Sequence, residues 1–356
     1  MPAPVIAPVI APVIGQLPAG ARNAITDVAG VTVGHCTLAQ GACQTGVTVV
    51  RPHAGNPYTD KVPAAATVLN GFGKSIGLVQ VEELGVLETP IALTNTFSVG
   101  ALAQAQIGAA IAANAEIGRA WPTVNPLVFE CNDGYLNDIQ AMAVHAGHYA
   151  QALADAGAEV AQGAVGAGRG MSSFGVKGGI GTASRVAGSY TVGALVLANF
   201  GTPESLVLAG RQVGQTLVAR LAGHGPATSP PTAPEKGSII MIVATDAPLD
   251  ARQLRRLSLR AGAGLARTGS VFGHGSGDIA LAFSTAYTVP HLADRPMPAL
   301  AMVHETRLDP LFRAAADSVE QAIVHALWHA EAVTGRDGHH RHALRTLLGA
   351  MPGDAP

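Results

Sequence analysis

The chain has 356 residues, of which 48% are hydrophobic, only 13% are charged and 4% are aromatic, with 43 glycines. This length supports a large core of Ala, Val, Leu and Ile with many close backbone approaches. A formal net charge of −2 argues against a nucleic-acid partner, because phosphates select a basic surface. The scarcity of charged residues indicates that copies of the chain cover part of its surface, since subunit interfaces are poor in Lys, Glu and Asp.

The cysteines and the first 21 residues indicate where the protein is located. Cys36, Cys43 and Cys131 form no CxxC pair, which is typical of a reducing compartment rather than of a disulfide framework or a zinc site. Residues 1–21 repeat Ala-Pro-Val-Ile, and such frequent prolines prevent a spanning helix. No basic residue precedes Arg22, so a signal peptide is not indicated. We expect a cytoplasmic protein with no membrane partner and an extended N-terminal arm that lies on a neighbouring subunit.

From Ile25 onward, short β-branched runs alternate with Gly-rich turns and predict strands, and apolar residues at helical spacing predict helices. The expected strands are 31–38, 45–52, 65–70, 90–95, 190–199, 239–244 and 279–286. The expected helices are 98–118, 135–157, 206–223, 250–269 and 309–334. This mixed order predicts an α/β protein in which helices enclose two sheets.

One long breaker-rich loop, 224–237, interrupts the body of the chain. It ends in Gly237, and Ser238 then opens directly onto the apolar run 239–244. A turn followed by a strand-entry serine is the ordinary interpretation of this dipeptide. A hydroxyl at the mouth of a buried strand is also where a nucleophile could be presented.

A second hydroxyl and a carboxylate stand together in "GHGSGD". Ser276 and Asp278 are two residues apart before an apolar strand, so their side chains are expected on the same face. A Gly-rich loop with a turn serine is the alternative. The stretch is not a nucleophile elbow, because His274 stands where G-x-S-x-G requires glycine.

Glu130 follows the apolar stretch "PLVF" and precedes ordinary turn and cap residues. A carboxylate at the end of a buried segment requires a cation, which either the protein or a substrate supplies. Both sources stay open at this point.

Two patterns suggest ligands and are rejected on their context. "GAVGAGRG", 163–170, lacks the preceding strand and the later acidic residue of a dinucleotide site. His325 and His329 lie four apart on a predicted helix, a spacing that could bind zinc, but no third ligand is apparent. We therefore expect no metal and no cofactor.

Six stretches spread over about residues 22–338 form one ordered set: "NGFGK", "ECNDGYLND", "KGGIGTASR", "KGSIIMIVATDAPL", "GSGDIALAFSTA" and "AVTGRDG". Taken together and in this order, they resemble one family, the DmpA-type aminopeptidases, which include L-aminopeptidase/D-esterases and β-peptidyl aminopeptidases.

The resemblance implies that the chain cuts itself between Gly237 and Ser238, which gives an arm (1–21), an α-chain (22–237, with the linker 224–237) and a β-chain (238–356). Ser238 then becomes the N-terminal nucleophile. Its free α-amine, with an ordinary pKa of about 7.7–8.0, is a candidate base. By the same resemblance Ser276 and Asp278 assist it, and Asn199 donates to the oxyanion. Asp278 stands where some members have Glu. We assign Glu130 to the ammonium group of the substrate.

The implied fold is the αββα sandwich shared with ornithine acetyltransferases, and the implied assembly is a homotetramer of two-chain protomers. The implied substrates are small peptides, or amino-acid amides and esters. An acyltransferase is the first alternative, although that group uses Thr where this chain has Ser238. An uncleaved, non-catalytic homologue is the second.

Overall fold

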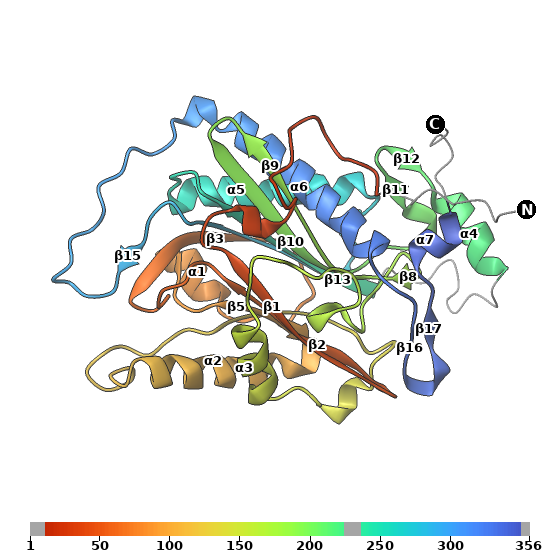
Figure 1. Ribbon diagram of the computed structural model, residues 1–356, viewed down its shortest axis with the longest axis horizontal. Helices are drawn as coiled ribbons and strands as arrows, with labels where there is room; N and C mark the ends of the chain where they lie inside the picture. The colour runs from red at the N-terminus through yellow and green to blue at the C-terminus, as the bar shows by residue number, and fades with distance from the viewer. Residues whose placement is uncertain (1–10, 224–235, 350–356) are drawn as a thin grey trace, which may run out of the picture.

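Two β-sheets packed face to face form the centre of the molecule, with helices covering both outer faces (Figure 1). The computed structural model describes residues 11–223 and 236–349. The αββα arrangement predicted from the sequence is confirmed. Most of the predicted linker, 224–235, lies outside the described residues.

The smaller sheet has the strand order β1–β2–β5–β6. The bounds of its strands are β1 (Thr32–Gln40), β2 (Cys43–Arg51), β5 (Ile91–Asn95) and β6 (Leu127–Cys131). β1, β2 and β5 pair antiparallel, whereas β6 runs parallel to β5. Because β5 and β6 are parallel, their carboxyl ends meet at one edge of the sheet, which places Thr96 beside Glu130.

The larger sheet has the order β15–β3–β14–β13–β10–β9, with β4 on β3. Its strands are β3 (Asp60–Gly71), β4 (Val86–Leu87), β9 (Gly179–Ala187), β10 (Tyr190–Asn199), β13 (Lys236–Thr245), β14 (Gly275–Ser284) and β15 (Val289–Pro290). Of these pairs only β13 and β14 are parallel. The start of β13 therefore lies beside the start of β14 and the end of β10.

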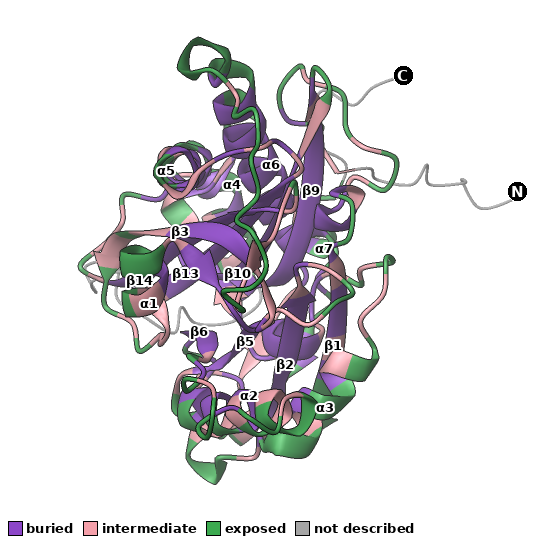
Figure 2. Cartoon of the chain, turned by 90° about the vertical axis from the view of Figure 1, so that its left-hand side faces the viewer, coloured by how far each residue is buried: buried purple, intermediate pink, exposed green. Residues whose placement is uncertain are grey.

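Strand β13 is buried on both faces, which explains its nearly continuous apolar sequence. Ile240 and Ile242 enter the core between the sheets, where they join Phe129 of β6. Ile239 and Met241 belong to the core beneath the outer helices. Figure 2 shows the buried residues concentrated in the sheets and in α6, with exposed residues on α2 and α3.

Two helices cover each sheet. α5 (Ala251–Arg267) and α6 (Asp309–Trp328) pack on the larger sheet, and α2 (Val99–Ala113) and α3 (Ala146–Ala154) on the smaller one. The remaining short elements are α1 (Leu78–Leu84), α4 (Gly214–Ala222), α7 (Leu344–Leu348), and the hairpins β7–β8 (Ser172–Ser173, Val176–Lys177), β11–β12 (Val207–Leu208, Arg211–Gln212) and β16–β17 (Val333–Thr334, His340–Arg341).

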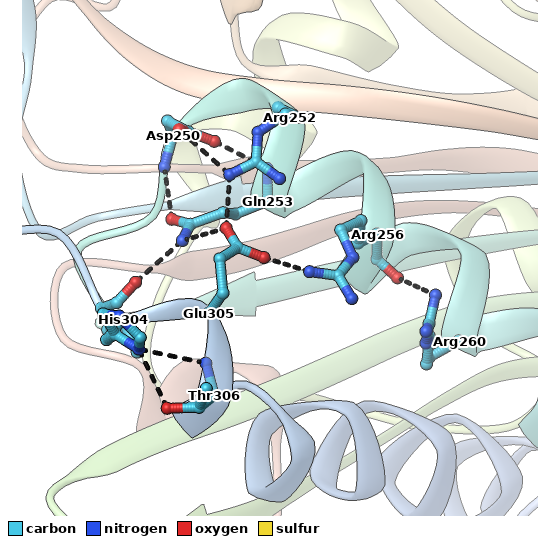
Figure 3. A network of polar contacts seen from close by, with 9 residues as sticks. Asp250, Arg252, Gln253, Arg256, Arg260, His304, Glu305 and Thr306 are labelled. Atoms are coloured by element: carbon cyan, nitrogen blue, oxygen red, sulfur yellow. Dashed lines mark hydrogen bonds and ion pairs between the residues drawn. The ribbon is translucent and has the colours of Figure 1, made fainter.

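A polar network fastens the segment before α6 to the first turns of α5 (Figure 3). Asp250 caps α5 through its Oδ1, which accepts from Gln253 N at 2.7 Å. Glu305 binds the guanidinium groups of Arg252 and Arg256. Hydrogen bonds, first from Arg252 and then from Gln253, lower the pKa of Glu305 to about 2.

Four predicted helices are wrong in part. The helix expected at 98–118 ends at Ala113. The first half of 135–157 is irregular, because Asp138 N donates to the carbonyl of Ala42, on a distant segment, instead of to a carbonyl four residues earlier. Within 206–223, residues 207–212 form a hairpin whose turn places Ala209 and Gly210 at positive φ. The helix expected to reach 334 ends at Trp328. Strand β9 was missed, because its glycines and small polar residues do not follow the β-branched pattern.

The described part of the N-terminal arm, residues 11–21, makes contacts with its own chain. Ile14 is buried, its N–H donates to Gln321 Oε1 at 2.8 Å, and its carbonyl accepts from Arg185 Nη2 at 2.7 Å. Arg185, itself 1% exposed, is thus the anchor of the arm.

Residues 96–113 are long and apolar enough to cross a membrane by length and composition alone, with a mean hydropathy of 1.3. This segment includes α2, which packs on β5, β6 and α3. Only 28% of it is buried, so an uncharged helix is left largely on the surface.

Candidate active site

Ser238 lies at the start of β13, between Asn199 on β10 and Gly277 on β14. It is 6% exposed. Its Oγ donates to the carbonyl oxygen of Gly237 at 2.7 Å and accepts from Gly277 N at 3.2 Å. The hydroxyl is therefore held against the carbonyl group of the peptide bond that precedes it.

Glycine is required on both sides of this hydroxyl. A Cβ on Gly237 would lie 2.6 Å from the carbonyl oxygen of Asn199, and one on Gly277 would lie 2.9 Å from the carbonyl oxygen of Phe72 and 3.1 Å from Ser238 Oγ. The two Gly-Ser motifs thus permit close backbone packing around Ser238.

Asn199 presents its carboxamide on the same face of the sheet as Ser238, since residues opposite each other on antiparallel strands lie about 5 Å apart at Cβ. Asn199 Oδ1 accepts from Ser172 N at 2.8 Å, and Nδ2 donates to the Asn132 carbonyl at 3.0 Å. A backbone N–H can only donate, so this contact fixes which end of the carboxamide is oxygen. Among residues 11–223 and 236–349, the second N–H of Nδ2 has no acceptor, so it can donate to another group.

Ser276 and Asp278 contact each other, as their two-residue spacing predicts. Ser276 Oγ donates to Asp278 Oδ1 at 2.5 Å, and both side chains are buried. Their register partners on β13 are Gly237 and Ile239, so by strand alternation the pair faces away from the Ser238 side chain. The structure thus places the pair beside the Gly237–Ser238 backbone rather than beside the hydroxyl.

Glu130 is 3% exposed. Its Oε1 accepts from Lys74 N at 2.8 Å and its Oε2 accepts from the Thr96 hydroxyl. In the described part of the chain no ion pair with Glu130 is found. A buried carboxylate with two neutral donors can still accept a cation.

Gly73 links Glu130 to the serine. A Cβ on Gly73 would lie 3.5 Å from Glu130 Oε1 and 3.8 Å from Gly277 Cα, and the Gly277 position in turn lies against Ser238 Oγ. The carboxylate and the hydroxyl therefore flank one small stretch of side-chain-free backbone. A short molecule could contact both.

The sequence analysis missed the residues that set this geometry through backbone atoms. Asn132 contributes a carbonyl, Ser172 and Lys74 contribute N–H groups, and Thr96 contributes the one side chain. The only sequence signal was the position of Thr96 directly after the predicted strand 90–95. Backbone donors leave no mark on residue type.

The rejected ligand patterns have structural explanations. His325 Nδ1 lies 2.7 Å from the Thr182 carbonyl and its Nε2 lies 3.0 Å from Gln321 Nε2, so both ring nitrogens are engaged by the protein. In the Gly-rich run, a Cβ on Gly166 would lie 2.4 Å from Thr48 Oγ1, and one on Gly168 would lie 2.5 Å from Ile180 N. These glycines pack strands together.

Residues 23–341 match the model of Peptidase family S58. The chain is 40% identical over 340 residues to the β-peptidyl aminopeptidase BapA of Sphingosinicella microcystinivorans, covering 90% of this chain and 85% of that one.

Two solved structures share the fold. A β-aminopeptidase from Burkholderia sp. has a TM-score of 0.87 and 43% identity, covering 96% of this chain and 98% of that one. The L-aminopeptidase D-Ala-esterase/amidase of Ochrobactrum anthropi, a prototype of the serine aminopeptidases and a variant of the Ntn-hydrolase fold, has a TM-score of 0.83 and 35% identity, covering 94% and 96%. The chain therefore belongs to peptidase family S58, the DmpA-type hydrolases, and has their fold.

Proposed function

We propose that this member of the family is a self-processing aminopeptidase that cuts its own Gly237–Ser238 bond and then uses Ser238 as an N-terminal nucleophile. The observation that carries the proposal is the contact of Ser238 Oγ with the Gly237 carbonyl oxygen, between Asn199 and the glycine at 277.

Processing needs no reactant other than water. Ser238 Oγ attacks the carbonyl carbon of Gly237, a C–O bond forms, and the C–N bond breaks as the amide nitrogen takes a proton. Water then hydrolyses the resulting ester. The products are a Gly237 carboxylate and a free α-amine on Ser238, the start of a 119-residue chain.

Substrate hydrolysis then repeats this acyl transfer between molecules. The free amine of Ser238 accepts the hydroxyl proton, because its ordinary pKa of about 7.7–8.0 lies near neutral pH. Glu130 binds the substrate ammonium, and the second N–H of Asn199 donates to the developing oxyanion. One such donor typically contributes about 2.7–4 kcal/mol to lowering the barrier.

Ser276 and Asp278 serve the amine in this proposal, not the hydroxyl. Their register beside residues 237 and 239 supports a role at the nitrogen that processing frees. The Ser276 hydroxyl, held by Asp278, orients that amine toward the Ser238 Oγ.

The substrates we propose are short peptides, or amides and esters of α- or β-amino acids with a free amine. We also propose a cytoplasmic homotetramer of two-chain protomers. Three unpaired cysteines and the uncharged surface of α2 support these two statements.

The test combines a mass measurement with an activity panel. Wild-type protein should give two chains, the smaller beginning at Ser238, and should hydrolyse aminoacyl or β-aminoacyl p-nitroanilides. Ser238→Ala should remain one chain and be inactive. A wild-type preparation that is fully active while uncut contradicts the proposal.

The same panel separates the alternatives. Transfer of the acyl group to an added amine in preference to water would indicate an acyltransferase of the same fold. A single, inactive chain would indicate a non-catalytic homologue.

A further inference from the structure

A buried lysine lies behind the oxyanion donor. Lys177, at the end of β8, is 0% exposed. Its Nζ donates to the carbonyl oxygens of Gly168 at 2.8 Å, Met171 at 2.7 Å and Gly178 at 2.8 Å. The three carbonyls belong to both sides of one loop, 168–178.

The geometry requires the lysine to be charged. Burial lowers the pKa of the Lys177 ammonium, and the nearby Arg169 lowers it further, while Asp133 raises it. Three acceptors within 2.8 Å need three N–H donors, and only the protonated amine has three. Without them, three buried carbonyls would lose their partners.

The loop that Lys177 holds is the loop that holds Asn199. Met171, whose carbonyl binds Nζ, directly precedes Ser172, whose N–H fixes Asn199 Oδ1 at 2.8 Å. Ser172 is also the register partner of Lys177 in the β7–β8 hairpin. The lysine thus fixes the peptide that donates to the carboxamide.

A second hydrogen bond fixes the other end of the Asn199 carboxamide. Asn199 Nδ2 donates to the Asn132 carbonyl at 3.0 Å. In a planar carboxamide, fixing the oxygen and one N–H also fixes the direction of the other N–H. That direction matters most in catalysis, because an oxyanion donor must be aimed before the charge develops.

We propose that Lys177 is a positioning residue for the oxyanion donor: its ammonium clamps the 168–178 loop so that Ser172 N holds Asn199 Oδ1, which aligns the free N–H of Asn199 Nδ2 toward the scissile carbonyl. The proposal rests on the proposed function for its catalytic consequence. Its structural content, that the orientation of Asn199 depends on Lys177, stands apart from turnover.

The test compares Lys177→Met, which keeps the aliphatic stem and removes all three donors, with Lys61→Met. Lys61 is a matched control, because its Nζ also binds a backbone carbonyl, that of Tyr58 at 2.9 Å, and it lies at the opposite end of β3 from the site. Lys177→Met should lower kcat, or the rate of chain cleavage, by about 10²–10³-fold, the loss of one oxyanion donor, with KM changed by less than about threefold. Lys61→Met should leave kcat unchanged.

A double-mutant cycle distinguishes positioning from general destabilisation. In an Asn199→Ala background, Lys177→Met should have almost no further effect on kcat, because the group it aligns is already absent. Losses that add in full would overturn the inference. If Lys177→Met does not fold, Lys177→Gln, which keeps two N–H donors, carries the same cycle.

A crystal structure of the lysine variant gives a readout that needs no turnover. The Ser172 N to Asn199 Oδ1 contact should be lost or lengthened. An unmoved Asn199 would overturn this inference alone, whereas an inactive wild-type enzyme with a displaced Asn199 in the variant would overturn only the proposed function.

Discussion

At the scale of single residues, Glu130 is the group whose charge decides what the site can bind. It is buried, receives hydrogen bonds from Lys74 N and Thr96 Oγ1, and has no ion pair in the described part of the chain. Of the two possible sources of a cation for Glu130, the protein and the substrate, the structure therefore favours the substrate. A blocked amine would leave the carboxylate buried and unpaired.

Glu130→Gln keeps the shape of the side chain and removes its charge. Breaking a buried ion pair typically costs about 3–5 kcal/mol, or roughly two to four powers of ten. The variant should lose most of its kcat/KM on free-amine p-nitroanilides and should discriminate less against their N-acetylated forms. Self-cleavage should survive, because the scissile bond of the precursor offers no amine at that position.

The control for this prediction is Glu88→Gln. Glu88 is also buried but lies 3.6 Å from its own cation, Lys61. This change should lower stability and leave the ratio of free-amine to acetylated activity unchanged. An unchanged ratio in Glu130→Gln would mean that Glu130 only supports the local fold.

The types of the candidate site residues and the contact between Ser276 and Asp278 could be predicted from the sequence, but the contacts that support them could not. Ser238, Ser276 and Asp278 stood out as polar residues beside apolar runs, and Asn199 was implied by the family resemblance. Their support comes from the backbone of Asn132, Ser172 and Gly277. Any residue has a backbone N–H, so no side-chain pattern marks these positions.

At the scale of elements, α6 is joined to β9 and to the N-terminal arm through His325. If Nδ1 donates to the Thr182 carbonyl, Nε2 must accept from Gln321 Nε2. The carboxamide of Gln321 cannot flip, because its Oε1 accepts hydrogen bonds from Ile14 N and Arg185 Nη2. A proton on His325 Nε2 would therefore face the N–H donor of Gln321 Nε2, and their hydrogen bond would be lost.

Burial, as the largest cause, lowers the pKa of His325 from 6.5 to about 4. Since the unfolded chain takes up the proton first, the contribution of His325 to stability is complete above pH 6.5 and is lost as the pH falls toward 4. The loss is on the order of 3 kcal/mol. Urea unfolding between pH 7 and pH 4 should show this decline, and His325→Gln, which does not titrate, should reduce it.

A surface substitution that removes no titrating group provides the comparison. Thr346→Ala, on the exposed side of α7, should leave the pH dependence of the free energy of unfolding as in the wild type. If His325→Gln has the same slope as the wild type, the interpretation of the His325 contacts is wrong.

For helices and strands, too, the residue pattern predicts the local structure but not the hydrogen bonds made to distant backbone groups. Strands flanked by Gly-rich turns, such as β10, were predicted at their observed bounds. The helix expected at 135–157 was half wrong, because the Ala42 carbonyl accepts from Asp138 N, an N–H group that a helix would use. Tertiary hydrogen bonds of this kind override apolar spacing.

At the scale of the whole molecule, one uncharged surface lies on α2 and α3. α2 contains no charged residue, and a groove of about 820 Å³ runs between it and α3, lined mainly by Ala, Gly and Leu with Tyr149 and His145. Outside the backbone of α2 itself, no atom of the described residues lies within 4 Å of a Cβ built on Gly100 or Gly108. Helix-interior glycine costs about 1 kcal/mol relative to Ala, and packing among the described residues does not require it.

We expect this face of α2 and α3 to be covered by another copy in the proposed tetramer. Gly108→Glu places a charge on the exposed side of α2, where burial against a second apolar helix would leave it unpaired. The variant should shift the mass measured by light scattering from four protomers to fewer, with two-chain processing intact. Thr346→Glu, which adds the same charge on the exposed side of α7, should keep the wild-type mass.

A Gly108→Glu protein that remains tetrameric would place the interface elsewhere, and a monomeric wild type would remove the assembly from the proposal. The helix would then be an apolar surface whose partner is of another kind, and binding to lipid vesicles would be the next measurement, because the same segment is long and apolar enough to enter a bilayer.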